Sequence, residues 1–228
     1  MQEKLKREII TTADGSTTIH LPALNEQYHS KHGAINEAKH VFIKEGLHTI
    51  LDTDDFEILH ILEIGFGTGL NALITYLEGE KRNQNICYVG VEAYPVVFDE
   101  VKLMNYPVIL NASNKEIVFD KMHQSVWEIP NSISSNFELT KRKQFFTDID
   151  DENTFNLIYF DAFGARVQPE LWTVEIFSKM YDALKTKGVL VTYSAKGSVR
   201  RAMQEVGFEV ERLPGPPGKR EMLRATKS

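Results

Sequence analysis

The residues best suited to chemistry form a glycine-rich loop that follows an apolar run. Residues 61–71 read I-L-E-I-G-F-G-T-G-L-N, so an apolar segment leads into Gly65, Gly67 and Gly69 and then into a segment of helical pattern. Glycines lack a β-carbon, so the backbone can turn sharply and approach a ligand closely. Between a strand and a helix, this arrangement is typical of a nucleotide-binding loop. The alternative is a tight turn without a ligand.

An acidic residue stands where such a loop needs one. Glu92 ends the next apolar run, 86–91, at the distance of about 20 residues that suits a carboxylate accepting both ribose hydroxyls. A dinucleotide fingerprint would place glycine at position 70, but this chain has Leu70 and its glycines are bunched as G-x-G-x-G. The pattern favours S-adenosylmethionine (SAM) over NAD. The alternative for Glu92 is a solvated strand end.

A second carboxylate follows another apolar run, 155–160, in the segment Asp161-Ala162-Phe163-Gly164. Strand ends of a parallel sheet meet at one edge, so we expect Asp161 and Phe163 beside the glycine loop. For methyl transfer to nitrogen, Asp161 would accept hydrogen bonds from the amine and Phe163 would supply a flat ring. With an ordinary pKa, Asp161 would orient the amine more than deprotonate it. The alternative is a loop-capping aspartate and a core phenylalanine.

A further acid, Asp148, follows a predicted short strand at 144–147 and could accept the adenine amino group or cap a helix. The full set of residues expected at the cofactor is Glu63, Gly65, Gly67, Thr68, Gly69, Asn71, Glu92, Asp148 and Asp161.

The elements that must position these residues alternate between apolar runs and helical patterns. The runs at 60–64, 86–91, 155–160 and 188–193 are each followed by a helical segment, which predicts a parallel sheet with helices on both faces. We expect an α/β fold of the class I methyltransferase (Rossmann-like) type, with a mostly parallel, seven-stranded sheet.

An extension precedes this sheet. Residues 9–21 carry β-forming residues on both sides of Asp14-Gly15 and predict a short hairpin. Residues 34–50 have apolar positions at helical spacing and predict an amphipathic helix. We expect residues 1–50 to form this extension and 51–228 the methyltransferase domain, as one folded unit.

The remaining segments are less regular. Residues 99–143 are too long for a bare crossover, so extra helices are expected there. A helix is predicted from Pro169 to Leu184, with Trp172 in the core. Two final strands, 208–213 and 221–226, are expected on either side of a proline- and glycine-rich turn.

The composition limits the class of protein. With 42% hydrophobic and 25% charged residues among 228, the chain has the composition of a globular protein and not of a disordered one. Residues 1–7 are charged and lead into no long apolar segment, so neither a signal peptide nor a membrane span is expected. The only cysteine, Cys87, permits no disulfide framework and fits a reducing cytoplasm. His29, His32 and His40 lack a cysteine or carboxylate framework, so no metal site is expected.

The charge pattern bears on possible partners. A net charge of −6 argues against a nucleic-acid partner, because phosphate contacts need a basic face. Local basic clusters nevertheless occur, and each is either a phosphate contact or an ordinary solvated surface. They are Lys141-Arg142-Lys143, Arg200-Arg201 and Lys219-Arg220.

Several motifs together resemble the MnmC-like family, which comprises the methyltransferase domain of the bifunctional wobble-uridine enzyme and its stand-alone counterparts. They are L-E-I-G-F-G-T-G-L-N, V-E-A, F-T-D-I, Y-F-D-A-F-G-A-R-V-Q-P-E-L-W and G-K-R-E-M-L. The resemblance covers nearly the whole chain and is weakest between Phe98 and Thr140. It also includes N-E-A-K-H-V-F at 36–42, a helix leading into the site, part of which could touch SAM.

The resemblance implies methylation of 5-aminomethyl-2-thiouridine to 5-methylaminomethyl-2-thiouridine at the wobble position of tRNA. It gives the glycines, Glu92, Asp148 and Asp161 the roles described above, and makes tRNA the partner, with Arg200, Arg201, Lys219 and Arg220 as candidate contacts. The 228 residues leave no room for a flavin-dependent oxidase domain, so another route is expected to deliver the aminomethyl nucleoside. Two alternatives stay open: an aminopropyltransferase of the spermidine synthase kind, and a non-catalytic module that binds RNA or protein.

Overall fold

The computed structural model describes residues 6–228. Part of the amino-terminal segment on which the signal-peptide prediction rests, residues 1–5, lies outside the described residues. Within the described range, no helix combines the length and the apolar composition that crossing a membrane requires.

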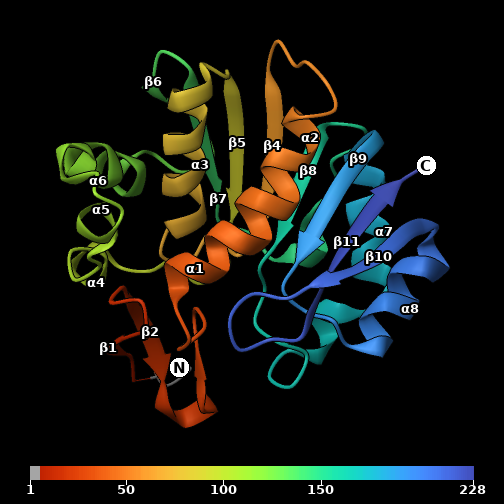
Figure 1. The fold of residues 1–228 in the computed structure, drawn as a ribbon, viewed down its shortest axis with the longest axis horizontal. Helices are drawn as coiled ribbons and strands as arrows, with labels where there is room; N and C mark the ends of the chain where they lie inside the picture. The colour runs from red at the N-terminus through yellow and green to blue at the C-terminus, as the bar shows by residue number, and fades with distance from the viewer. Residues whose placement is uncertain (1–5) are drawn as a thin grey trace.

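A large central sheet organises the molecule (Figure 1). Its order is β10-β11-β9-β8-β4-β5-β7-β6, with β4, β5, β7, β8 and β9 parallel and β6, β10 and β11 antiparallel to their neighbours. The α/β prediction is confirmed, with eight strands where seven were expected, because β6 folds back as a hairpin on β7. The strands are β4 (Leu59–Ile64), β5 (Ile86–Val91), β6 (Asn131–Ser134), β7 (Phe137–Arg142), β8 (Phe155–Phe160), β9 (Leu184–Thr192), β10 (Phe208–Pro214) and β11 (Glu221–Lys227).

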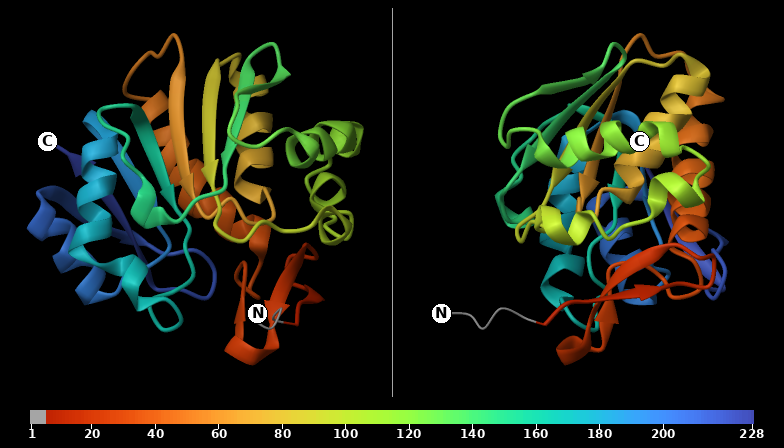
Figure 2. Two further views of the ribbon diagram at one scale, coloured as in Figure 1. Left: turned by 180° about the vertical axis from the view of Figure 1, so that it is seen from behind. Right: turned by 90° about the vertical axis from the view of Figure 1, so that its left-hand side faces the viewer.

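Helices cover both faces of this sheet, as predicted. Successive side chains of a strand point to opposite faces, so Ile61 joins one buried cluster and Leu62 the other. The first cluster lies under α1 (Ala34–Ala38), η2 (Lys39–His48), α2 (Thr49–Leu51) and α3 (Leu70–Arg82). The second lies under α7 (Val174–Ala183) and α8 (Gly197–Val206), which Figure 2 shows from behind.

The helix predicted at 34–50 is present as one continuous helical segment, but its middle part, η2, is a π-helix. This part packs closely on the sheet at Gly46. A β-carbon at that position would lie 3.0 Å from Cγ2 of Val191 and 3.4 Å from the ring of Tyr159. The segment therefore runs across β8 and β9 so closely that a side chain at position 46 would require its neighbours to move.

The predicted hairpin is also present, as β1 (Glu8–Thr11) and β2 (Thr17–Leu21), followed by η1 (Pro22–Leu24) and a short third strand, β3 (Glu26–Gln27). Of the pair Asp14-Gly15, only Gly15 has a positive φ, of 83°. Asp14 instead closes the turn with its side chain, which accepts a hydrogen bond from the Ser16 amide at 3.1 Å.

The extra helices expected within 99–143 are confirmed. They are α4 (Phe98–Val101), α5 (Tyr106–Ile109), η3 (Ser113–Lys115) and α6 (Glu116–Gln124), and they lie beside the β5–β7 side of the sheet in Figure 1.

Two predicted elements differ from the structure, one in type and one in continuity. Residues 144–147 form no strand, because β7 ends at Arg142 and the chain then turns into a 3-10 helix, η4 (Phe146–Asp148), closed by the Asp148 amide on the Phe145 carbonyl. The helix predicted from Pro169 to Leu184 is broken at Thr173 into η5 (Pro169–Trp172) and α7, and Leu184 already belongs to β9. The Thr173 hydroxyl caps α7 by accepting from the Ile176 amide, so the helix starts there.

The close packing at Gly46 gives a test of the fold. Gly46→Leu is expected to lower the free energy of unfolding by about 1–3 kcal/mol, because the new side chain must fit between η2 and the sheet. Lys39→Leu places the same side chain on the exposed face of η2 and should change stability by less than about 0.5 kcal/mol. Chemical denaturation measures both, and equal stabilities would show that η2 moves off the sheet without cost.

Candidate active site

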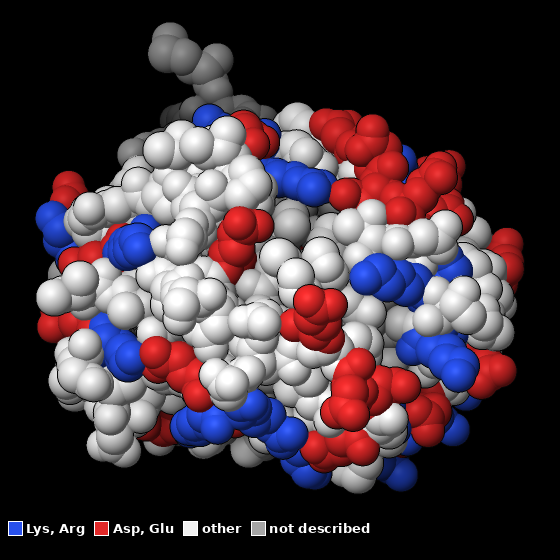
Figure 3. All heavy atoms as spheres, turned by 90° about the horizontal axis from the view of Figure 1, so that it is seen from above, with Lys and Arg blue, Asp and Glu red and all other residues white. Residues whose placement is uncertain are grey.

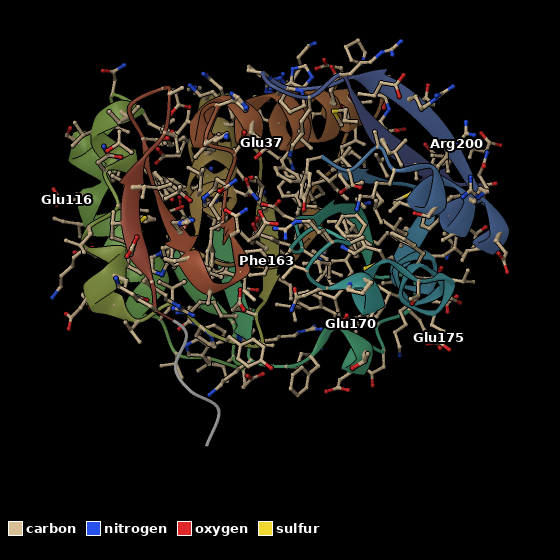
Figure 4. All side chains as sticks on the ribbon, turned by 90° about the horizontal axis from the view of Figure 1, so that it is seen from below. Glu37, Glu116, Phe163, Glu170, Glu175 and Arg200 are labelled. Carbon is tan, nitrogen blue, oxygen red and sulfur yellow. The ribbon has the colours of Figure 1, made fainter. Side chains whose placement is uncertain are left out.

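A cavity of about 540 Å³ opens at the carboxyl ends of β4, β5 and β8, and it has the size of a small-molecule site. Figure 4 looks onto this edge and places Glu37 and Phe163 near its middle. The opposite edge, in Figure 3, is a convex surface on which acidic and basic side chains are intermixed.

The glycine loop forms one wall of this cavity. Gly65, Gly67 and Gly69 have φ angles of 92°, 49° and 72°, all in the region that disfavours other residues. A β-carbon on Gly65 would lie 2.8 Å from the backbone oxygen of Asp161. The loop therefore lies directly against the end of β8, and the two predicted halves of the site are in contact.

Glu92 is fixed by backbone amides at the end of β5. Its two carboxylate oxygens accept hydrogen bonds from the Gly67 amide at 3.0 Å and from the Tyr94 amide at 2.9 Å. Burial raises the pKa of Glu92, and the two amides oppose this shift. Each oxygen retains a free lone pair, so this carboxylate fits a ligand with a pair of hydroxyl groups.

Asp161 is joined to a second carboxyl group by an amide. The Asn71 side-chain nitrogen donates to Oε1 of Glu63 and to Oδ2 of Asp161, both at 2.9 Å. Burial raises the pKa of Asp161 to about 7; neighbouring Glu37 adds to the shift, while Asn71 and Lys219 reduce it. Burial likewise raises the pKa of Glu63.

Aromatic rings complete the wall around Asp161. Phe163 lines the cavity and meets Tyr28 edge to face, with ring centroids 5.1 Å apart. The Tyr193 hydroxyl donates to the Ala162 carbonyl at 2.8 Å. Trp172 is buried, as predicted, and its indole N–H donates to the Phe163 carbonyl at 2.8 Å, which holds the loop after β8.

The structure brings most of the predicted cofactor residues to the cavity and leaves three aside. The lining includes Glu63, Gly65, Gly67, Asn71, Glu92, Asp161 and Phe163. Thr68, Gly69 and Asp148 do not line it. The Thr68 hydroxyl turns away to bond the Tyr106 hydroxyl at 2.9 Å, and Asp148 is exposed at the end of η4, while its neighbour Thr147 reaches the cavity.

Several lining residues were not singled out by the sequence, among them Tyr28, Glu37 and Tyr193, and Lys219 was expected at a tRNA phosphate instead of in the cavity. The resemblance pointed only to the helix that carries Glu37. A usable signal was present there, because Glu37 stands among Ala34, Ile35 and Ala38 on the buried face of α1.

The basic clusters are not the uniform surface patches that sequence reasoning considered. Lys141 is buried and donates to the His123 carbonyl, and Arg142 pairs with Asp151 at 2.6 Å. Lys219 lies in the cavity and pairs with Glu37, whereas Arg220 is exposed. Arg200 lies at the rim of Figure 4, away from Phe163.

These features fit SAM. The glycine loop leaves backbone space that a side chain would fill, and the fixed carboxylate of Glu92 has the chemistry to accept hydrogen bonds from a pair of hydroxyl groups. Within residues 6–228, His, Cys, Asp and Glu side chains form no group of three or more that could hold a metal ion.

Comparison with known proteins agrees with this geometry. Residues 118–228 match a family described as S-adenosyl-L-methionine-dependent methyltransferase. The tRNA 5-methylaminomethyl-2-thiouridine biosynthesis bifunctional protein MnmC of Hydrogenovibrio crunogenus is 27% identical over 240 residues, covering 97% of this chain and 34% of that protein. The corresponding protein of Legionella pneumophila is 27% identical, covering 95% of this chain and 36% of that protein. The chain thus spans about a third of the length of these relatives.

Solved structures share the fold. The crystal structure of MnmC2 from Aquifex aeolicus has a TM-score of 0.78 at 23% identity and covers 100% of this chain and 72% of that one. Spermidine synthase from Thermotoga maritima has a TM-score of 0.59 at 15% identity, with 100% of this chain and 71% of that one covered. At these identities the likeness concerns the fold alone.

The geometry at Glu92 predicts the effect of its removal. Glu92→Gln is expected to weaken SAM binding by about 10- to 100-fold, since a lost hydrogen bond to a charged acceptor costs about 1.5–3 kcal/mol. Calorimetric titration measures this, with Glu175→Gln, at the exposed rim of Figure 4, as the control that should bind like the parent. Unchanged affinity in Glu92→Gln would remove this carboxylate from the cofactor site.

The raised pKa of Asp161 predicts a pH-dependent stability. Between its ordinary value of 3.8 and about 7, the folded state keeps a proton that the unfolded chain has lost, so stability falls as the pH rises through this window. Asp161→Asn removes the free-energy cost of ionising this buried carboxyl group. The variant should be more stable than the parent by an amount of the order of 2 kcal/mol near pH 8, and by less near pH 5. Urea unfolding without SAM measures the difference, with exposed Asp150→Asn as control. A difference independent of pH would contradict the environment assigned to Asp161.

Proposed function

Because the chain is a SAM-dependent methyltransferase related over nearly its whole length to part of the MnmC proteins, we propose that it methylates the amine of 5-aminomethyl-2-thiouridine at the tRNA wobble position. The product is 5-methylaminomethyl-2-thiouridine. The observation that carries this proposal is the position of Asp161, a carboxyl group in the cavity wall, in contact with the glycine loop and beside an aromatic ring.

The acceptor's chemistry explains what Asp161 contributes. A primary alkylamine resembles a lysine side chain, with a pKa of about 10, so near neutral pH it is protonated and has no free lone pair. An ordinary aspartate is a weak base for such an ammonium group. Burial raises the pKa of Asp161 to about 7, which reduces the difference between its pKa and that of the amine and supports a role for Asp161 as proton acceptor.

The surroundings of Asp161 support this role. Asn71 holds one carboxylate oxygen at 2.9 Å and leaves the other for the acceptor. Phe163 and Tyr28 line the same cavity and offer flat surfaces for a base. When bound, SAM supplies the electrophilic methyl group, and the protein's part is to orient the nitrogen and receive its proton.

The tRNA contacts are part of the proposal. Arg220, Arg200 and Arg201 remain the candidates for phosphate contacts, whereas Lys219 is assigned to the cavity. So few cations predict only a modest salt dependence of tRNA binding. A cytoplasmic location belongs to the same proposal.

A methylation assay tests the function. With SAM and tRNA carrying 5-aminomethyl-2-thiouridine, the protein should produce the methylaminomethyl nucleoside, detected by mass spectrometry. Asp161→Asn should lower kcat by roughly 10²–10⁴ with little change in SAM affinity, and raising the pH should recover part of the loss. Asp150→Asn is the control.

The contrary outcomes are distinct. Parental activity of Asp161→Asn from about pH 6.5 to 9 would make this residue structural. Transfer of an aminopropyl group from decarboxylated SAM to a polyamine, with no methylation of tRNA, would favour the spermidine synthase alternative.

A further inference from the structure

The cavity contains an alkylammonium group that belongs to the chain itself. Lys219, in the loop between β10 and β11, lines the cavity and pairs through Nζ with Oε1 of Glu37. The same Nζ lies 3.7 Å from the centroid of the Tyr193 ring. A carboxylate and an aromatic ring face that both contact a cation form a recognised arrangement for binding ammonium groups.

Glu37 is built into this position. It lies on α1 with only 7% of its surface exposed, and its Oε2 accepts a hydrogen bond from the Ser30 amide at 2.9 Å. This amide fixes the carboxylate and leaves Oε1 for a cation. Glu37 is also close enough to Asp161 to raise the pKa of that carboxyl group, and both side chains line the same cavity.

The aromatic side of the arrangement is equally fixed. The Tyr193 hydroxyl donates to the carbonyl of Ala162, the residue after Asp161. The ring over which Lys219 lies is therefore tied to the loop that carries the proposed proton acceptor.

The chemistry of Lys219 matches that of the proposed acceptor. Both end in a methylene group that bears a primary ammonium. We propose that Glu37 and the Tyr193 ring form the receiving site for the acceptor's alkylammonium group, and that Lys219 fills this site until the acceptor displaces it. The inference rests on the proposed function in taking the acceptor to be a primary amine.

The side chain of Lys219 can leave this site while the loop between β10 and β11 stays in place. His40 donates through Nε2 to the Pro214 carbonyl at 2.8 Å, and Gly218 packs so closely on His32 that a β-carbon would lie 2.3 Å from its ring. These contacts hold both sides of the loop. Displacement then needs only a movement of the lysine side chain, after which the acceptor passes one N–H proton to Asp161 and exposes its lone pair.

Binding of a small amine tests this competition. The probe is the nucleoside 5-aminomethyluridine, titrated by NMR into protein saturated with S-adenosylhomocysteine; 5-hydroxymethyluridine is the uncharged counterpart. If Lys219 fills the site in about nine of ten molecules, Lys219→Met should tighten aminomethyl binding about tenfold. Hydroxymethyl binding should not change. Glu37→Gln should weaken aminomethyl binding at least about tenfold, alone and combined with Lys219→Met.

Matched controls lie outside the cavity. Lys39→Met removes a positive charge and Glu175→Gln a negative one, and both residues are exposed and do not line the cavity. Neither should reproduce the effects. Weaker or unchanged aminomethyl binding in Lys219→Met, or parental binding in Glu37→Gln, would overturn the proposal. A loss of SAM affinity in Lys219→Met would do so too, because it would assign this lysine to the cofactor.

A measurement on the unmodified protein avoids any effect of mutation on folding. The ε-protons of Lys219 lie over a ring and should resonate upfield of those of exposed lysines. Saturating 5-aminomethyluridine should remove this shift, and 5-hydroxymethyluridine should not. A shift that persists with the amine bound would show that Lys219 stays in place.

The outcomes separate this inference from the proposed function. Displacement of Lys219 without methylation of tRNA would support the ammonium site and contradict the proposal that tRNA is the methyl acceptor. Methylation of tRNA without displacement would leave the function intact and overturn the site.

Discussion

The contact on which the site depends is the amide of Asn71 between two carboxyl groups. Glu63 ends in the core beneath the glycine loop and Asp161 follows β8, and one nitrogen on α3 donates to both. Without a donor, two buried carboxyl groups this close would each disfavour the other's ionisation. Through its two hydrogen bonds, this amide connects the end of β4, the first turn of α3 and the acid at the end of β8. The close approach of Gly65 to the Asp161 backbone follows from the same geometry.

Local pattern predicted the residues that stand at strand ends, and it failed where side-chain direction or distant packing decides. Gly65, Glu92 and Asp161 were located because parallel strands end at one edge, whatever their sequence separation. Thr68 belongs to the same motif, but its hydroxyl turns into the core to meet Tyr106, which no spacing rule could indicate. The strand predicted before Asp148 was wrong because its apolar residues pack as a turn of helix.

Two residues far apart in the chain form a contact that sequence reasoning did not predict. Glu37 and Lys219 are 182 positions apart and meet only after the extension and the last hairpin have packed on the sheet. Taken alone, a lysine beside an arginine resembles a surface patch, and nothing in the local pattern around Glu37 indicates which residue pairs with it. Their pairing offsets one negative charge in a cavity whose lining includes six acidic residues: Glu26, Glu37, Glu63, Glu92, Asp161 and Glu170.

The strand order has a consequence for how the protein is made. β11 follows every other strand of this sheet in the chain, and it pairs with β9 on one side and with β10 on the other. Until the ribosome has released it, β9 presents an unpaired edge and β10 has no partner in the sheet. Such an edge is a site for wrong association. The nascent chain therefore depends on β11 to close this part of the sheet, and a product interrupted before Glu221 would carry the glycine loop without a completed sheet behind it.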